Sequence, residues 1–326
     1  MSLFQRTRTF GLVISAAVGL SACNQDVDLA QVRALSQTVQ AAEPSYASIA
    51  DDLYQSCLRE VSWHYIGNFS LKVAQAPAAT PATSNETPQQ TTALGVASAI
   101  NGGAVPSKDP FADAAVCQPY IASVRRWKAV SALLTGYFDQ LGAASADDSK
   151  VNYGFSTLFG NAKKDAGFSS SQESALSGFA TDIATAIFAA RRRQLTAEQA
   201  AKAKAAVDYL VMQLTKVAND DYLAQLDNEQ GDIDSFFGRN FVAQNVGLQT
   251  LETIQYRLDW RSAVDSVNAK RTAEVAYVGS LKKLMDGNDA IVKAAATNDF
   301  SSVYAVASAT VALLRPDILA LQKAFK

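Results

Sequence analysis

The chain of 326 residues carries 29 basic and 31 acidic side chains and one histidine, which gives a formal net charge of −2. Nucleic acid is therefore not an expected partner, because phosphate binding needs a concentrated basic patch. Apolar residues make up 48% of the chain and charged residues 18%, which is enough to bury one large core or two smaller ones.

The first 23 residues differ from the rest of the chain. The opening MSLFQRTRTF carries Arg6 and Arg8 and no acidic residue, and the apolar run from Phe10 to Leu20 follows it. This run is far shorter than the roughly 20 residues of a helix that spans a bilayer. A basic start, a short apolar core and small residues at its end are typical of a secretory signal peptide.

The residues Leu20-Ser21-Ala22-Cys23 resemble the lipobox of bacterial membrane lipoproteins. The resemblance covers residues 1–23 only, and no family is recognised for the rest of the chain. It implies that residues 1–22 are cleaved, that the thiol of Cys23 and the new amino terminus are acylated, and that residues 23–27 form a lipidated tether. Three acyl chains would anchor the protein stably. The alternative is an ordinary signal peptide in which a cysteine falls at this place by chance.

The residue after Cys23 is Asn24 rather than Asp. In lipoproteins of Gram-negative bacteria, Asp at this position is the usual signal for retention in the inner membrane. For a Gram-negative host we therefore expect a lipid-anchored protein of the outer membrane that faces the periplasm. The loss of Arg6 and Arg8 with the signal peptide would leave a net charge of about −4.

Helical periodicity dominates residues 28–326. A first helix is predicted from Asp28 to Glu43, where Pro44 ends it, and a second from about Ile49 to Ala74. Residues 74–108 then hold four of the eight prolines and no aromatic residue. This segment is too poor in large apolar side chains to repay its ordering entropy, so we predict a low-complexity disordered loop.

Asp109-Pro110 has the pattern of a helix start, with Asp as cap and Pro at the first helical position. This helix is predicted to run to about Leu141, and Pro119 either kinks it or marks its true start. The remaining predicted elements, in chain order, are a short helix at 155–164, helices at 170–193 and 196–229, a break at Gly231-Asp232, a long helix at 236–285, a stop at Gly287-Asn288, and a terminal helix at 301–324 kinked at Pro316. The helix at 236–285 would be roughly 70 Å long unless it bends near Gly247.

No strand pattern of convincing length occurs, so the sequence predicts an all-α protein. Long helices joined by short turns favour antiparallel neighbours. We therefore expect residues 28–326 to form an elongated up-and-down bundle that contains the loop 74–108.

Two cysteines remain once Cys23 is assigned to the lipid. Cys57 and Cys117 would lie in an oxidising compartment, where disulfides form and persist. A bridge between them would join the two helices that flank the loop 74–108. The alternative is a pair of buried thiols.

Catalytic and metal-binding motifs are not found in the sequence. His64 is the single histidine, so H-E-x-x-H is impossible, and G-x-S-x-G and the P-loop pattern do not occur. Ser280-Leu281-Lys282-Lys283 matches S-x-x-K but lacks its K-T-G and S-D-N partners, and the acidic run 219–235 lacks the glycine step of an EF-hand. The sequence therefore favours a non-enzymatic protein over an enzyme, without a cofactor or a metal.

Two clusters are candidate partner-binding surfaces, because Trp, Tyr and Arg are enriched at binding hot spots. The first combines Trp63-His64-Tyr65 with Tyr120, Trp127, Tyr137 and Phe138 of the partner helix, near the two cysteines. Its alternative is the core between two helices. The second is Tyr256-Arg257-Leu258-Asp259-Trp260-Arg261, for which the alternative is internal packing and salt bridging. The candidate partner-binding residues are Trp63, His64, Tyr65, Trp127, Tyr256, Arg257, Trp260 and Arg261.

The sequence thus predicts a membrane-anchored helical lipoprotein that binds another envelope protein as a scaffold, an assembly accessory or a toxin inhibitor. The alternatives are a binder of small molecules or peptides in a pocket between helices, and an enzyme acting on envelope polymers. A tether of five residues reaches at most ~18 Å. We therefore expect the partner in or beside the leaflet, or within one bundle length of it.

Overall fold

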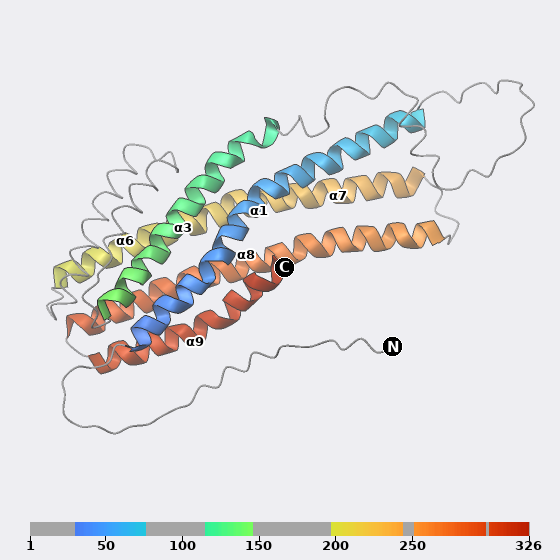
Figure 1. The fold of residues 1–326 in the computed structure, drawn as a ribbon. Helices are drawn as coiled ribbons and strands as arrows, with labels where there is room; N and C mark the ends of the chain where they lie inside the picture. Colours follow the sequence, from blue (N-terminus) through green and yellow to red (C-terminus); the bar gives the residue numbers. More distant parts are fainter. Residues whose placement is uncertain (1–29, 76–114, 146–196, 244–250, 298–299, 326) are drawn as a thin grey trace, which may run out of the picture.

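The computed structural model describes residues 30–75, 115–145, 197–243, 251–297 and 300–325. All regular secondary structure in these ranges is helical, which confirms the predicted all-α bundle (Figure 1). The elements are α1 (Ala30–Gln75), α3 (Gln118–Ser145), α6 (Ala197–Lys216), the π-helix η2 (Val217–Tyr222), α7 (Leu223–Ala243), α8 (Leu251–Ala296) and α9 (Phe300–Ala324).

The helices alternate in direction along one long axis (Figure 1). The elements α6, η2 and α7 follow one another as a single rod, so α1, α3, this rod and α8 form four successive antiparallel runs, with the shorter α9 beside them. Helix α1 packs against α3, α7 and α9, and α8 packs against α6, α7 and α9. We call the end that holds the start of α1 the proximal end, and the end that holds the start of α8 the distal end.

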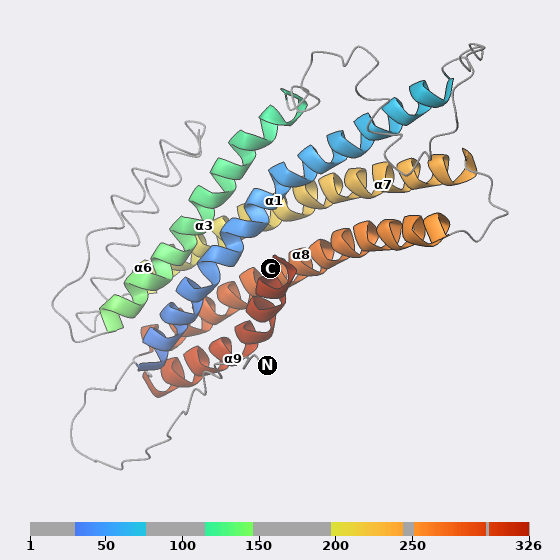
Figure 2. The ribbon, with the colours of Figure 1, turned by 45° about the vertical axis from the view of Figure 1, so that its right-hand side comes forward.

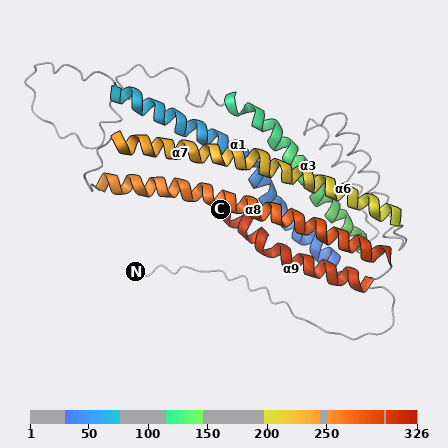
Figure 3. The same cartoon turned by 180° about the vertical axis from the view of Figure 1, so that it is seen from behind.

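Helix α9 covers only part of α8. It runs from the proximal end to about the middle of the bundle, beside the half of α8 that leads to Ala296 (Figures 2 and 3). The first half of α8 continues beyond α9 toward the distal end, next to α7. One face of α8 is therefore covered in one half and open in the other.

Four fully buried aromatic residues fix the middle of the bundle. Tyr46 of α1 and Trp127 of α3 pack on Tyr277 of α8, with ring centroids 5.0 and 5.6 Å away. Tyr222 of η2 lies 5.9 Å from Trp127. The indole Nε1 of Trp127 donates to the Tyr277 hydroxyl at 2.7 Å. Buried Trp and Tyr side chains need such polar partners, so this contact fixes how α3 sits on α8.

The expectation that Pro44 ends the first helix is wrong. Helix α1 continues through it to Gln75, although an interior proline removes one helical hydrogen bond and costs about 3 kcal/mol. The side chains around Pro44, including Ala42 and Tyr46, are buried in the core, and this packing outweighs the local penalty. By contrast, Pro119 lies in the first turn of α3, where proline is tolerated, so it marks the start of that helix.

The predicted breaks at Gly231-Asp232 and Gly287-Asn288 are also wrong, because α7 and α8 continue through them. The predicted helix 236–285 is instead divided between α7 and α8. Gly287 has a packing role: a Cβ there would lie 2.5 Å from Oγ1 and 2.6 Å from Cγ2 of Thr310 in α9. Close packing leaves no room for it, so this glycine sets the distance between α8 and α9.

Replacing Gly287 by alanine should therefore lower the free energy of unfolding by about 1–3 kcal/mol, because the added methyl overpacks the contact with Thr310. Gly231 is the matched control, since a Cβ there would meet nothing within 4 Å. Gly231→Ala should be neutral or stabilising by up to ~1 kcal/mol through helix propensity. Urea unfolding of both variants measures the difference, and equal losses would contradict this role of Gly287.

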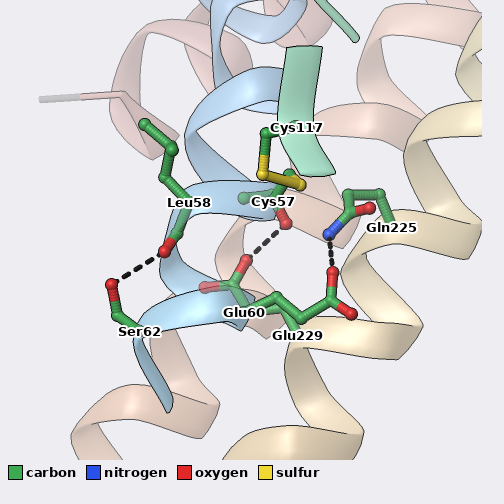
Figure 4. Close-up of a disulfide and its surroundings, with 8 residues drawn as sticks. Cys57, Leu58, Glu60, Ser62, Cys117, Gln225 and Glu229 are labelled. Atoms are coloured by element: carbon green, nitrogen blue, oxygen red, sulfur yellow. Dashed lines mark hydrogen bonds between the residues drawn. A yellow bond between two sulfur atoms is a disulfide. The ribbon is translucent and has the colours of Figure 1, made fainter. Parts of the chain in front are cut away.

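The disulfide between Cys57 and Cys117 is confirmed (Figure 4). Cys57 lies in the middle of α1 and Cys117 directly before α3, with their Cα atoms 5.8 Å apart. Both cysteines are buried. The bridge therefore holds the start of α3 on α1 across a sequence separation of 60 residues.

Several sequence predictions lie outside the described residues. These are the signal peptide and tether, the loop 74–108 beyond Gln75, the helix start at Asp109-Pro110, and the helices at 155–164 and 170–193.

Candidate partner-binding groove

A groove of about 740 Å³ lies at the distal end, between α7 and the first half of α8. The second cluster singled out in the sequence supplies much of its lining. The lining residues are Phe237 and Gly238 of α7 and Tyr256, Arg257, Leu258, Trp260, Arg261, Val264 and Asp265 of α8. The structure thus brings four of the candidate partner-binding residues to one site.

An aromatic cluster from three helices supports one wall of the groove, which Phe237 and Tyr256 line. Phe237 packs against Tyr256 with ring centroids 4.9 Å apart and against Phe236 at 5.0 Å. Trp63 reaches across from α1 and lies 5.3 and 5.6 Å from these two phenylalanine rings. The Tyr256 hydroxyl donates to the backbone oxygen of Phe237 at 3.0 Å. The wall is therefore held by both ring contacts and a hydrogen bond.

The rim of the groove presents large side chains to solvent. Trp260 is 44% exposed and Leu258 is 54% exposed. The indole Nε1 of Trp260 donates to Oδ1 of Asp234 on α7 at 2.9 Å, which orients the ring without burying it. Arg257 and Arg261 are exposed along the same stretch of α8. Oriented Trp and Arg side chains beside an apolar surface are typical of binding hot spots.

The groove is open because α9 ends before it. Leu258, Arg261 and Asp265 follow the three- and four-residue spacing of one helix face. The same spacing, continued along α8, leads to Gly279, Lys283 and Gly287. There α9 covers the face: the Nζ of Lys283 lies 2.6 Å from Asp317 Oδ2, and Gly287 packs on Thr310. The groove thus lies on the same face of α8 that α9 covers in the other half of this helix.

The first candidate cluster does not form one surface. Trp63 lies behind the groove wall, whereas Trp127 is fully buried in the middle of the bundle and is a core residue. The His64 side chain is exposed, with Nδ1 3.8 Å from Oδ2 of Asp232. The side chain of Tyr65 lies outside the part that the structure describes. Trp63 and Trp127 therefore do not line one groove, and the burial of Trp127 agrees with the alternative of a core between helices.

Sequence reasoning missed a buried ionic cluster between α1, α7 and α8. The guanidinium of Arg59 binds Glu229 through Nε at 2.6 Å and Asp52 through Nη1 at 3.0 Å. Lys270 Nζ lies 3.6 Å from Asp52 Oδ1. The Tyr222 hydroxyl of the π-helix donates to Asp52 Oδ2 at 2.7 Å. Two carboxylates and two cations thus balance one another inside the bundle.

The titration of these groups reflects their burial. Desolvation opposes the charge of Arg59, but the hydrogen bond to Glu229 and the field of Asp52 outweigh it and raise its pKa. Desolvation lowers the pKa of Lys270 despite the nearby carboxylates. Burial and then the charge of Asp52 raise the pKa of Tyr222. The carboxylates are engaged by these partners, so the cluster stabilises the helix contacts rather than presenting a free acid or base.

The cluster also supports the groove. Arg59 precedes Trp63 by one helical turn on α1, and Glu229 precedes Phe236 by about two turns on α7. An ion pair that fixes these two helices therefore also fixes the aromatic rings next to it. The Ser56 hydroxyl also donates to Glu229 Oε2 at 2.6 Å. The sequence holds a signal of this cluster, since the polar Asp52 and Ser56 share the helical stripe of the apolar Ile49 and Leu53.

Glu274 of α8 is a buried carboxyl, and its Oε1 accepts no hydrogen bond from the described residues. Desolvation raises its pKa, so ionisation is more costly in the folded than in the unfolded chain. The folded state therefore loses stability as the pH rises from the unfolded pKa, about 4.3, through the folded pKa.

Glu274→Gln should consequently raise the free energy of unfolding at pH 7 by about 1 kcal/mol, because the variant cannot ionise. The gain should disappear near pH 3.5, where both forms are neutral. Chemical unfolding at the two pH values measures it. If the variant is less stable than the wild type at pH 7, Glu274 is not a destabilising buried carboxyl. The same conclusion follows if its free energy of unfolding changes equally at both pH values.

Residues that raised the question of metal or catalytic chemistry have structural contacts. Asp227 pairs with Arg271 at 2.6 Å, and Glu229 belongs to the ionic cluster. Among the described residues, no group of three or more His, Cys, Asp or Glu side chains is placed to hold a metal ion. The buried hydroxyl of Ser280 lies 2.9 Å from the Tyr46 hydroxyl and donates to the Tyr277 backbone.

No protein-family model, curated protein or solved structure matches this chain.

Proposed function

We propose that this protein is a lipoprotein of the outer membrane, anchored through Cys23 and facing the periplasm, that binds another envelope protein through the groove. It would act without catalysis, as a scaffold, an assembly accessory or a toxin inhibitor. The observation that carries the proposal is the oriented, half-exposed Trp260 on a rim with two arginines above an aromatic wall. Clusters of exposed Trp and Arg side chains of this kind contribute most of the affinity of many protein interfaces.

The shape of the groove favours a protein segment as its occupant. Leu258 and Ile254, one helical turn apart on α8, are about half exposed, and together they offer an apolar strip along this helix. Arg261 also lines the groove, three positions after Leu258 on the same helix face, and its guanidinium suits a carboxylate on the partner. A helix with an apolar stripe and acidic neighbours would fill the position that α9 occupies farther along α8.

A small-molecule or peptide ligand is the second candidate. The groove volume of about 740 Å³ falls within the usual range of ligand sites, roughly 300–1,000 Å³. The exposure of Trp260 and Leu258 favours the larger partner, because a small-molecule site buries most of its ligand between its walls.

The groove lies far from the proposed anchor along the bundle. Helix α1 starts at the proximal end with Ala30 and brings Trp63 to the groove wall, and the helical rise between them amounts to about 50 Å. The partner site is thus separated from the tether by most of the bundle.

A photoreactive amino acid in place of Leu258 tests the groove in living cells, with the same probe at Met212 of α6 as the control, since Met212 is equally exposed at 54%. We expect a defined protein adduct from position 258 and none of that mass from position 212. Trp260→Ala should reduce its yield about tenfold, the effect of losing a hot spot. A probe at 258 that captures no protein contradicts the proposal, and capture of a small molecule supports the second candidate.

The anchor is tested separately by palmitate labelling and by the mass of the amino-terminal peptide. Acylated Cys23 is expected at the start of the mature chain. An unmodified Cys23, or a chain that starts elsewhere, contradicts the anchor but not the groove.

A further inference from the structure

Helix α9 has two apolar faces. Val303, Ala307, Leu314, Ile318 and Leu321 are buried on its inner face, against α8 and α1. Its outer side exposes Leu319 at 61%, with Leu313 at 57% and Tyr304 at the two edges of that side. By length and composition Ser301–Ala324 is a candidate membrane span, yet most of it is not buried inside the bundle. Since the inner face of α9 packs on α8 and α1, its outer face is the part that can contact a lipid leaflet.

The charges of α9 are divided between these faces. Asp317 is the single carboxylate of the helix, and it turns inward to Lys283 at 2.6 Å. Arg315 and Lys323 are exposed. The exposed residues of α9 thus include leucines, alanines, a serine and a tyrosine, with two cations and no anion. This combination suits the boundary between acyl chains and anionic headgroups.

The start of α9 lies next to the start of α1. Gln31 Nε2 donates to the Tyr304 hydroxyl at 3.4 Å, and both helices begin at the proximal end (Figure 1). Only residues 24–29 separate Cys23 from Ala30 in the sequence, and a chain of this length spans at most about 25 Å. A lipid on Cys23 would therefore bring a leaflet within reach of the outer face of α9.

We propose that the outer face of α9 lies on the lipid leaflet that holds the acyl chains of Cys23, so that the bundle lies along the membrane. This inference rests on the lipid anchor of the proposed function and adds a second contact with the membrane. Since α8 continues beyond α9, the groove would face the leaflet across a space about one helix wide, roughly 10 Å. Its partner would then be a helical segment close to the membrane surface.

Photocrosslinking of the full-length protein in native envelopes tests the docking of α9. The probe replaces Leu313 or Leu319, and Met212 is the control because α6 packs on α3 and α8 rather than on α9. We expect phospholipid adducts from positions 313 and 319 at a yield at least tenfold above that from position 212. With the probe at 313, Leu319→Asp should lower the lipid yield several-fold, whereas Met212→Asp should not change it.

The outcomes separate this inference from the proposed function. Equal lipid yields at all three positions, or protein adducts in place of lipid at 313 and 319, overturn the docking of α9. If Cys23 is acylated and position 258 captures its protein in the same cells, the proposed function stands while this inference falls. If Cys23 is not acylated, the anchor of the proposed function fails, and the inference that rests on it falls with it.

Discussion

Replacing Cys57 and Cys117 together by alanine should lower the free energy of unfolding by about 4 kcal/mol. The bridge closes a loop of about 60 residues, and the chain-entropy model assigns this stabilisation to the restricted unfolded chain. Both cysteines are buried between α1 and the start of α3. Removing the bridge therefore also frees the beginning of α3 to separate from α1.

Urea unfolding of the oxidised wild type and the double variant measures this loss. The wild type treated with a reductant is the control, and its midpoint should fall toward that of the variant. A variant that unfolds at the same urea concentration as the oxidised wild type would contradict a stabilising role for the bridge.

Replacing Arg59 by methionine should cost about 3 kcal/mol, the lower end of the range for breaking a buried ion pair. The lower end applies because the Arg59 side chain keeps 33% of its surface accessible. Its removal leaves Glu229 and Asp52 buried with Lys270 as the remaining cation of the cluster. Arg59→Lys should lose less, since it keeps the charge but not the forked hydrogen bonds.

Arg271 supplies the matched control. It pairs with Asp227 at the same distance, 2.6 Å, but Asp227 is largely exposed, and exposed pairs contribute at most about 1 kcal/mol. Arg271→Met should therefore have a small effect on urea unfolding. Equal losses for the two variants would mean that burial does not distinguish the pairs, and the account of the ionic cluster would be wrong.

The sequence revealed the helices but not all of their ends. Apolar residues at helical spacing identify α1, α8 and α9, because this periodicity is the direct record of one face packing on a core. Pro44 and Gly287 were interpreted from local propensity, which predicts a break. In the fold, buried neighbours outweigh the proline, and the glycine is required by the side chain of Thr310. Whether a helix continues through such a residue therefore depends on neighbours that are distant in the sequence.

The candidate site was predicted in part for the same reason. Tyr256, Arg257, Trp260 and Arg261 are close in sequence, so one helical segment brings them together. The aromatic cluster behind them joins Trp63 to Phe237, which are more than 170 positions apart in the sequence. No local sequence pattern predicts that contact. Likewise, Arg59 and Glu229 meet only once α1 and α7 are side by side. Trp127 was misplaced because an aromatic residue on a helix serves a core as readily as a groove.

Oxidative footprinting of Trp260 tests the partner-binding groove most directly. Hydroxyl radicals modify accessible Trp and Met side chains, and in the isolated bundle Trp260 and Met212 are 44% and 54% exposed. Intact envelopes and the purified protein are oxidised under identical conditions, and the ratio of Trp260 to Met212 modification is compared. If a partner occupies the groove, the ratio of Trp260 to Met212 modification should be several-fold lower in envelopes than in the purified protein, because the partner covers Trp260 and leaves Met212 exposed. An unchanged ratio would contradict a groove that is occupied where the protein works.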